Sequence, residues 1–235
     1  MTAATVIEGC AIATVDAAGT EHRDGHLVVD GDRIVAIGDG PAPETPGARR
    51  IDGRGMLATP GLVNCHHHLY QWATRGLAQQ ATLFEWLVEL YPVWAHVDDE
   101  IEWAAARAGL AALARSGCST TTDHHYVFPA GVGDLLEVEV RAAASIGVRF
   151  NPCRGSMDLG RSAGGLPPDE IVEDRDVILA ASEDAVVHPD SSSAASPARA
   201  AARSISASIR AQVGYSSTSH SNSVACCASP RVAHW

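Results

Sequence analysis

The sequence predicts an α/β protein with a β-rich stretch over residues 5–58 and alternating strands and helices from residue 59. Two β-branched runs around Asp30-Gly31 are typical of a hairpin. After Pro60, short apolar runs alternate with longer patterns that carry helix-capping residues at their ends. This alternation of strand and helix patterns stops at about residue 188, so we expect the last part of the chain to differ in structure from the rest.

Within the β-rich stretch, Gly25–Gly38 predicts two strands that meet at Asp30-Gly31. Residues 41–47 read as a loop, because they are rich in proline and glycine. Arg50–Leu57 leads to the next strand, and Leu62-Val63 fits a short buried strand entered through Pro60-Gly61.

The strongest predicted helix is Asp98–Ser116, with acidic residues in its first turn and Gly117 at its end. Cys118–Asp123 predicts the strand after it, because it is rich in threonine. A second helix is expected over residues 134–146, closed by Gly147. A strand over Val148–Cys153 and a third helix over residues 169–182 follow. Strands that alternate with helices in this way favour a parallel sheet.

Residues 189–235 have a different composition, with 13 serines and 11 alanines among 47 residues. This segment carries a net charge of +3, whereas residues 1–188 carry −14. Two interpretations stay open: a Ser/Ala-rich disordered tail, or the product of a shifted reading frame. The second is consistent with a GC-rich gene, since all 17 basic residues are arginine. Either way, we expect deletion of the tail to leave residues 1–188 nearly unchanged.

Composition excludes several classes of partner. A net charge of −11 argues against nucleic acid, because phosphate binding requires a basic surface. No apolar run approaches the roughly 18 residues of a membrane span. The N-terminus shows no secretory signal, and the six cysteines form no Cys-x-x-Cys pair. We therefore expect a cytoplasmic protein with reduced thiols and no membrane partner.

Three consecutive histidines, His66, His67 and His68, form the most informative motif. In a strand, residues i and i+2 point to the same side. His66 and His68 would then present two imidazoles together, while His67 points away, and such a pair can bind one metal ion. The alternative is a polar loop with a chance histidine cluster. By the same alternation, Cys65 turns away from the pair, and we expect it in the core.

The segment Pro60–His68 resembles the first-strand metal motif of the amidohydrolase superfamily. Three further stretches, Leu83–Trp94, Cys118–Tyr126 and Phe150–Asp158, resemble its deaminases of the 8-oxoguanine and the hydroxyatrazine and chlorohydrolase types. The resemblance runs from about residue 5 to about residue 188.

For the fold, this resemblance implies the N-terminal portion of a (β/α)8 TIM-type barrel, preceded by a small β-sandwich element and followed by an aberrant tail. The expected domains are the β-sandwich element over 1–58, the partial barrel over 59–188 and the tail over 189–235. Homo-oligomers are what the family leads us to expect.

For the site, the resemblance implies that His66 and His68 bind one divalent metal ion, Zn²⁺ or alternatively Fe²⁺. The family's later metal ligands and its acid-base glutamate are not identifiable in this chain, so the catalytic residues stay unknown. Gln71 is a candidate contact to a purine edge, with a solvent-facing loop residue as the alternative. Arg154 is a candidate contact to a carbonyl of the substrate, with a surface ion pair as the alternative.

Other residues near these candidates have open roles. His124 and His125 end the second predicted barrel strand, where one could approach the pocket and where a structural histidine is the alternative. Trp72, Trp86 and Trp94 are expected to pack beneath the first loop, with substrate stacking as the alternative.

The implied function is metal-dependent hydrolytic deamination of an amino-substituted heterocycle, such as 8-oxoguanine or a guanine-like purine. A hydroxytriazine or chlorotriazine is the alternative substrate. Because two imidazoles alone form an incomplete site, we expect this chain to be inactive as written. The competing interpretation is a truncated, non-catalytic binding or assembly module of the same superfamily.

Overall fold

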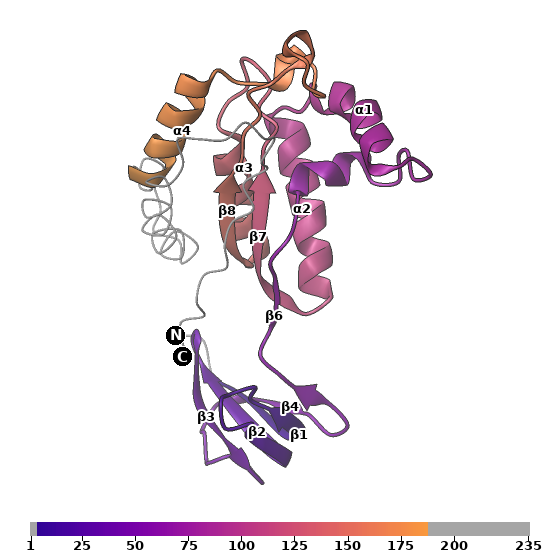
Figure 1. The fold of residues 1–235 in the computed structure, drawn as a ribbon. Helices are drawn as coiled ribbons and strands as arrows, with labels where there is room; N and C mark the ends of the chain where they lie inside the picture. The colour runs from indigo at the N-terminus through magenta and orange to yellow at the C-terminus, as the bar shows by residue number, and fades with distance from the viewer. Residues whose placement is uncertain (1–3, 188–235) are drawn as a thin grey trace. The chain divides into compact units, whose positions relative to one another are not determined.

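The computed structural model describes residues 4–187 (Figure 1). These residues belong to two compact units, the first ending at Gly61 and the second beginning at Leu62. Each unit has its own sheet, and they are described separately below. No helix in the described range has the length and apolar character needed to span a membrane.

The first unit is one mixed sheet with the strand order β3-β2-β1-β4, and β5 pairs with β1 beside β4. In the described residues this unit has a single sheet, where the resemblance implied a small β-sandwich element. The predicted hairpin is confirmed: β2 and β3 are antiparallel, and Gly31 in the turn has a φ of 60°. The strands are β1 (Thr5–Ala13), β2 (Glu21–Asp30), β3 (Arg33–Asp39), β4 (Arg49–Asp52) and β5 (Leu57–Ala58).

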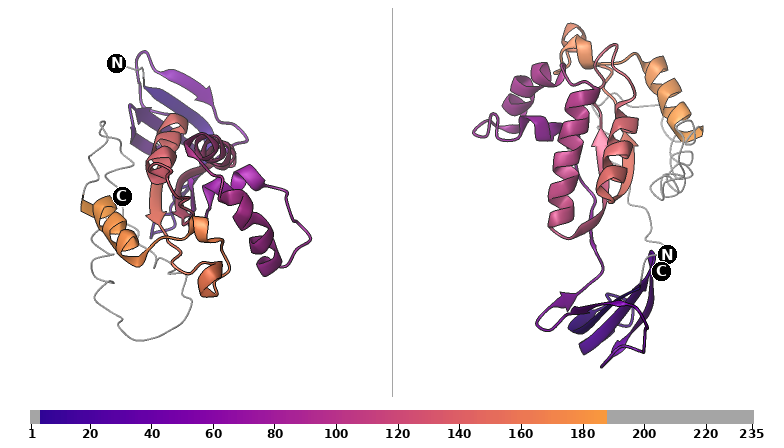
Figure 2. Two further views of the ribbon diagram at one scale, coloured as in Figure 1. Left: turned by 90° about the horizontal axis from the view of Figure 1, so that it is seen from above. Right: turned by 180° about the vertical axis from the view of Figure 1, so that it is seen from behind.

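The second unit contains three parallel strands in the order β6-β7-β8, which are Leu62–Asn64, Cys118–His125 and Arg149–Arg154. Two helices, α2 (Asp99–Arg115) and α3 (Leu135–Ile146), pack against each other and against this sheet (Figure 2). This βαβαβ order is that of the opening part of a (β/α)8 barrel.

Both helices begin and end where the sequence predicts. The Asp98 carboxylate accepts a hydrogen bond from the Ile101 amide at 2.8 Å, and Asp134 accepts two bonds at the start of α3. Gly147 ends α3 with a φ of 85°, a left-handed conformation that glycine adopts without a steric penalty.

The third predicted helix begins later than expected. Residues 169–171 form a short 3-10 helix, η3 (Asp169–Ile171), and the helix α4 (Arg175–Val187) starts only after an extended Val172. The Asp174 carboxylate accepts a bond from the Asp176 amide at 2.9 Å, which caps α4 at that point. The prediction of one helix over 169–182 was therefore wrong in its first turn. Residues 189–235 lie outside the described residues, and so does the prediction for the tail.

Leu83–Trp94 forms a further helix, α1, ahead of α2. The Glu85 carboxylate accepts a hydrogen bond from the Thr82 amide at 2.9 Å, which satisfies one of the free amides at the helix start. A 3-10 helix, η1 (Leu69–Thr74), precedes α1, and another, η2 (Arg161–Ala163), follows β8.

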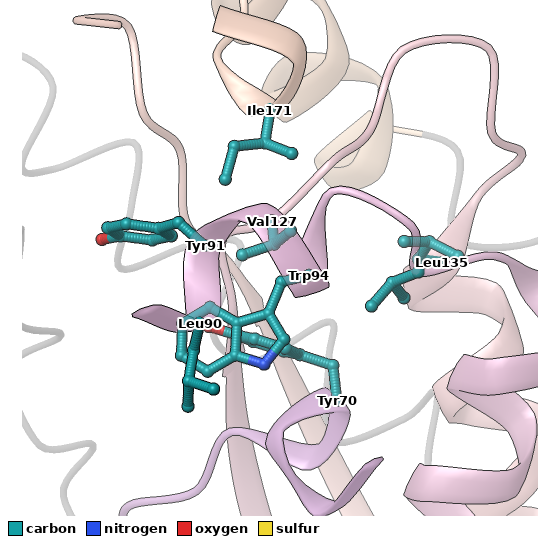
Figure 3. Packing of buried hydrophobic residues seen from close by; sticks show 8 residues of the cluster. Tyr70, Leu90, Tyr91, Trp94, Val127, Leu135 and Ile171 are labelled. Atoms are coloured by element: carbon teal, nitrogen blue, oxygen red, sulfur yellow. The ribbon is translucent and has the colours of Figure 1, made fainter. Parts of the chain in front are cut away.

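An aromatic core holds η1 in place above the sheet (Figure 3). The Trp94 ring packs edge-on against the Tyr70 ring, with centroids 5.2 Å apart, and its indole donates a hydrogen bond to the Thr74 hydroxyl at 3.0 Å. Trp86 packs against the same cluster, so Trp86 and Trp94 have the expected packing role. The buried members are Tyr70, Leu90, Tyr91, Trp94, Val97, Val127, Leu135 and Ile171.

Candidate functional site

The three histidines follow the end of β6 at Asn64, and His66 and His68 lie close together while His67 is directed elsewhere. The rings of His66 and His68 lie with their centroids 5.1 Å apart and nearly perpendicular. His67 faces elsewhere: its Nε2 accepts a hydrogen bond from the Trp72 indole at 3.3 Å, and its Nδ1 lies 3.7 Å from Asp123. The structure therefore brings together the two imidazoles that the sequence singled out.

The ring of His68 is held by the neighbouring strand. Its Nδ1 lies 2.7 Å from the carbonyl oxygen of His124, and because a carbonyl can only accept, Nδ1 carries the proton. Nε2 is then the nitrogen with the free lone pair. Burial lowers the pKa of His68, which favours the neutral imidazole that a metal ion requires.

The imidazole groups of these two residues are suitable ligands for a transition-metal ion, but they supply only two ligands. Zinc sites use three or four protein ligands. Among residues 4–187, no group of three or more metal-binding side chains includes His66 or His68. Their role as metal ligands stays a prediction.

Cys65 does not have the core position that we expected, because its side chain is exposed. The reason is that β6 ends at Asn64, so strand alternation does not extend to Cys65. The Asn64 side-chain oxygen instead accepts a hydrogen bond from the His66 amide at 3.2 Å, as in a turn.

Gln71 lies in η1, half-buried, next to two phenol groups. Its Nε2 donates to the Tyr70 hydroxyl at 3.3 Å and points toward the Tyr126 hydroxyl at 3.5 Å. The Tyr126 ring in turn stands edge-on to the His68 ring, with centroids 5.3 Å apart. Gln71 is thus connected to the histidine pair through Tyr126, and its contact with a substrate stays a prediction.

Arg154 ends β8, as predicted, and its guanidinium is already engaged. It forms an ion pair with Glu173 at 2.5 Å and lies 4.2 Å from the Phe128 ring centroid. The arginine side chain is only 9% exposed, so this pair is largely buried rather than a surface ion pair. A contact from Arg154 to a substrate carbonyl stays a prediction.

The two histidines at the end of β7 have different surroundings. The half-buried His124 ring lies 5.7 Å from the His68 ring. His125 is fully buried, with Nδ1 3.0 Å from a Glu139 carboxylate oxygen and Nε2 2.7 Å from the Val127 carbonyl. Of the two roles weighed for this pair, His125 has the hydrogen-bonded structural one.

Glu102 and Glu139 were not among the predicted site residues, and one carboxylate oxygen of each lies within 4.0 Å of His125 Nδ1. Both carboxylates are fully buried, and burial is the main reason that the pKa of Glu102 rises to about 9. Burial and the charge of Asp123 likewise raise the pKa of Glu139. A signal was present: Glu139 occupies a helix position whose neighbours at three-residue spacing, such as Ala142, face the core.

Comparison with known proteins places these residues in a family context. The amidohydrolase family model matches residues 57–220. The 8-oxoguanine deaminase of Pseudomonas aeruginosa is 41% identical over 174 residues, which are 73% of this chain and 39% of that protein. The hydroxydechloroatrazine ethylaminohydrolase of Pseudomonas sp. is 33% identical, over 72% of this chain and 38% of that protein.

A solved structure shows the same architecture. The atrazine chlorohydrolase of Arthrobacter aurescens TC1, complexed with zinc, superposes with a TM-score of 0.70 at 32% identity. The match covers 82% of this chain and 44% of that structure. The chain therefore spans about two fifths of the length of the curated relatives that it matches.

Proposed function

The chain belongs to the amidohydrolase family, and from this premise we propose that it represents the N-terminal part of a metal-dependent hydrolytic deaminase. The proposed substrate is an amino-substituted heterocycle of the 8-oxoguanine or guanine type. The observation that carries the proposal is the pair His66 and His68, whose ring centroids lie 5.1 Å apart after the first barrel strand while His67 is directed elsewhere.

In this proposal, His66 and His68 hold one divalent ion. They would hold a Zn²⁺ ion, whose bound water has a pKa of about 7 and would provide a hydroxide nucleophile near neutral pH. The zinc in the related chlorohydrolase structure supports this choice of metal, and Fe²⁺ is the alternative because imidazole binds both. The chain's own contribution is the bond from His68 to His124, which orients the ring.

Gln71 and Arg154 are the proposed substrate contacts. The Gln71 amide offers both donors and an acceptor, which suits the edge of a purine, and it lies one phenol ring away from His68. Arg154 would contact a ring carbonyl only by sharing or giving up its ion pair with Glu173. The 8-oxoguanine deaminase relative supports a purine substrate, and the two triazine-related proteins make a hydroxytriazine or chlorotriazine the alternative.

The second candidate is a non-catalytic module. It is favoured by the incomplete ligand set, because the described residues place no third metal ligand beside His66 and His68. We propose that the 235-residue chain by itself does not turn over, since a general acid is also needed for ammonia to leave.

A chimera separates the two candidates. Residues 1–187 of this chain would replace the matching part of the Pseudomonas aeruginosa 8-oxoguanine deaminase, which supplies the remaining barrel. We expect ammonia release from 8-oxoguanine or guanine by the chimera and none by the 235-residue chain. A well-folded chimera that releases no ammonia from any purine or triazine would favour the non-catalytic module.

Single substitutions in the chimera then test the site. His66→Ala or His68→Ala should remove both the metal and the activity, because each deletes one of the ligands. His96→Ala is the matched control, since His96 is exposed and lies just after α1. A His68→Ala chimera with full metal content and full activity would contradict the proposed role of the pair.

A further inference from the structure

We propose that Glu102, His125 and Glu139 form a second metal site, a closed structural one for a divalent ion such as Zn²⁺. The three side chains come from α2, from the end of β7 and from α3. All three are fully buried, and none of them belongs to the His66 and His68 pair. The inference goes beyond the proposed deaminase function and does not depend on it.

The donor atoms are close enough to share one ion. His125 Nδ1 lies 3.0 Å from Glu139 Oε1 and 4.0 Å from Glu102 Oε2, and the three donor atoms all fall within 4.8 Å of one another. Metal bonds of about 2 Å at tetrahedral angles separate neighbouring donors by about 3.3 Å. A small rotation of the Glu102 side chain would therefore bring it to ligand distance.

A neutral His125 ring has the tautomer of a metal ligand. Its Nε2 faces the Val127 carbonyl at 2.7 Å and must donate, so the lone pair of a neutral ring lies on Nδ1, toward the two carboxylates. A ligating histidine in proteins usually donates its other ring nitrogen to a carbonyl or a carboxylate in this way.

The carboxylates of this cluster have no arginine partner in the described residues. Within residues 4–187, the basic group that lies within 4.0 Å of Glu102 and Glu139 is His125. Both Glu102 oxygens and Glu139 Oε2 are buried without a hydrogen-bond partner, and so is Oδ2 of the nearby Asp123. Buried carboxyl oxygens without a partner are costly in a protein interior, and a bound cation would satisfy them together.

The position of this cluster defines its role. All three residues are fully buried, so no substrate has access to them, and the site is closed as structural metal sites are. One ion would cross-link α2, α3 and the end of β7. The adjacent His124 carbonyl orients His68, so the cross-link would also stabilise the strand end on which the histidine pair depends.

The test begins with the 235-residue chain carrying His66→Ala and His68→Ala, which removes the other histidine pair. After removal of metal with a chelator, the protein is titrated with Zn²⁺, and the bound stoichiometry and the melting temperature are measured. We expect one tightly bound equivalent and a higher melting temperature with zinc. Adding Glu102→Gln and Glu139→Gln should abolish both effects. Glutamine has the same shape as glutamate, but its amide is a poor zinc ligand.

Glu100→Gln is the matched control, since Glu100 is an exposed residue of the same helix. It should leave zinc binding and the melting temperature unchanged. Zinc binding that persists in the Glu102→Gln, Glu139→Gln protein would place the ion elsewhere and overturn the proposal. A protein that binds no zinc and becomes more stable with Glu102→Gln would also overturn the proposal. The cluster would then hold a proton instead of a metal.

Discussion

The Nδ1 of His68 donates a hydrogen bond to the carbonyl oxygen of His124 across 2.7 Å. This bond joins the segment after β6 to the end of β7, two segments that are 56 residues apart in the sequence. It leaves Nε2 of His68 free and directs that ring toward His66. The pairing of parallel strands thus decides which nitrogen of a candidate metal ligand is available.

Gln71→Ala should weaken catalysis without removing the metal. In an active chimera we expect metal content to persist while kcat/KM falls by the equivalent of about 1–3 kcal/mol, because a hydrogen bond to the substrate is lost. Metal analysis beside ammonia release checks this. Gln80→Ala, at an exposed position, is the control. Wild-type kinetics of Gln71→Ala on every purine and triazine tested would exclude the substrate contact.

Asp134→Ala should destabilise the second unit. The Asp134 carboxylate accepts bonds from the Leu136 and Glu137 amides at 3.0 and 3.2 Å, and both amides lose their partner in the variant. Loss of such a cap costs about 0.5–2 kcal/mol of unfolding free energy. Urea unfolding measures it, with Glu44→Ala in an exposed loop as the control. Equal unfolding midpoints for the two variants would contradict the capping role.

In metal-free protein, stability should fall as the pH rises from about 4.5 to about 9, the unfolded and folded pKa values of Glu102. The folded state keeps the proton that the unfolded chain has released, so raising the pH favours unfolding by at most about 1.4 kcal/mol per pH unit for each such group. Three neighbouring groups also affect the pKa of Glu102: the charge of His125 lowers it, and those of Glu139 and Asp123 raise it.

The comparison is with Glu102→Gln, whose amide cannot ionise. We expect urea unfolding across this pH window to give a shallower pH dependence for the variant than for the unsubstituted protein. If the two curves run parallel, Glu102 ionises freely in the folded protein and the account of its burial is wrong.

The 235-residue chain should self-associate. Within the described residues, β6 pairs only with β7, and its side chains Leu62 and Val63 are 59% and 63% exposed. We expect concentration-dependent oligomers in sedimentation experiments, and Val63→Lys should shift them toward the monomer because a charge at a strand edge opposes pairing. Ile34→Lys, at an exposed apolar residue of the first unit, is the control. An equal shift with both variants would show that β6 is not the associating surface.

Local sequence signals accounted for much of the fold. The caps at Asp98 and Asp134 and the left-handed Gly147 mark helix ends, because each acts on backbone groups only a few residues away. His66 and His68 lie close together as expected, but they follow the end of β6, so strand alternation does not account for their arrangement.

The sequence by itself therefore determined the strands of the second unit and the two capped helices between them, because caps and backbone periodicity act locally. Only the tertiary structure decided the surroundings of Glu102 and Glu139, the ion pair of Arg154 with Glu173, and the exposure of Cys65. These depend on which residues from distant segments pack against each side chain. Burial and electrostatic partners act through space, and local sequence patterns do not encode them.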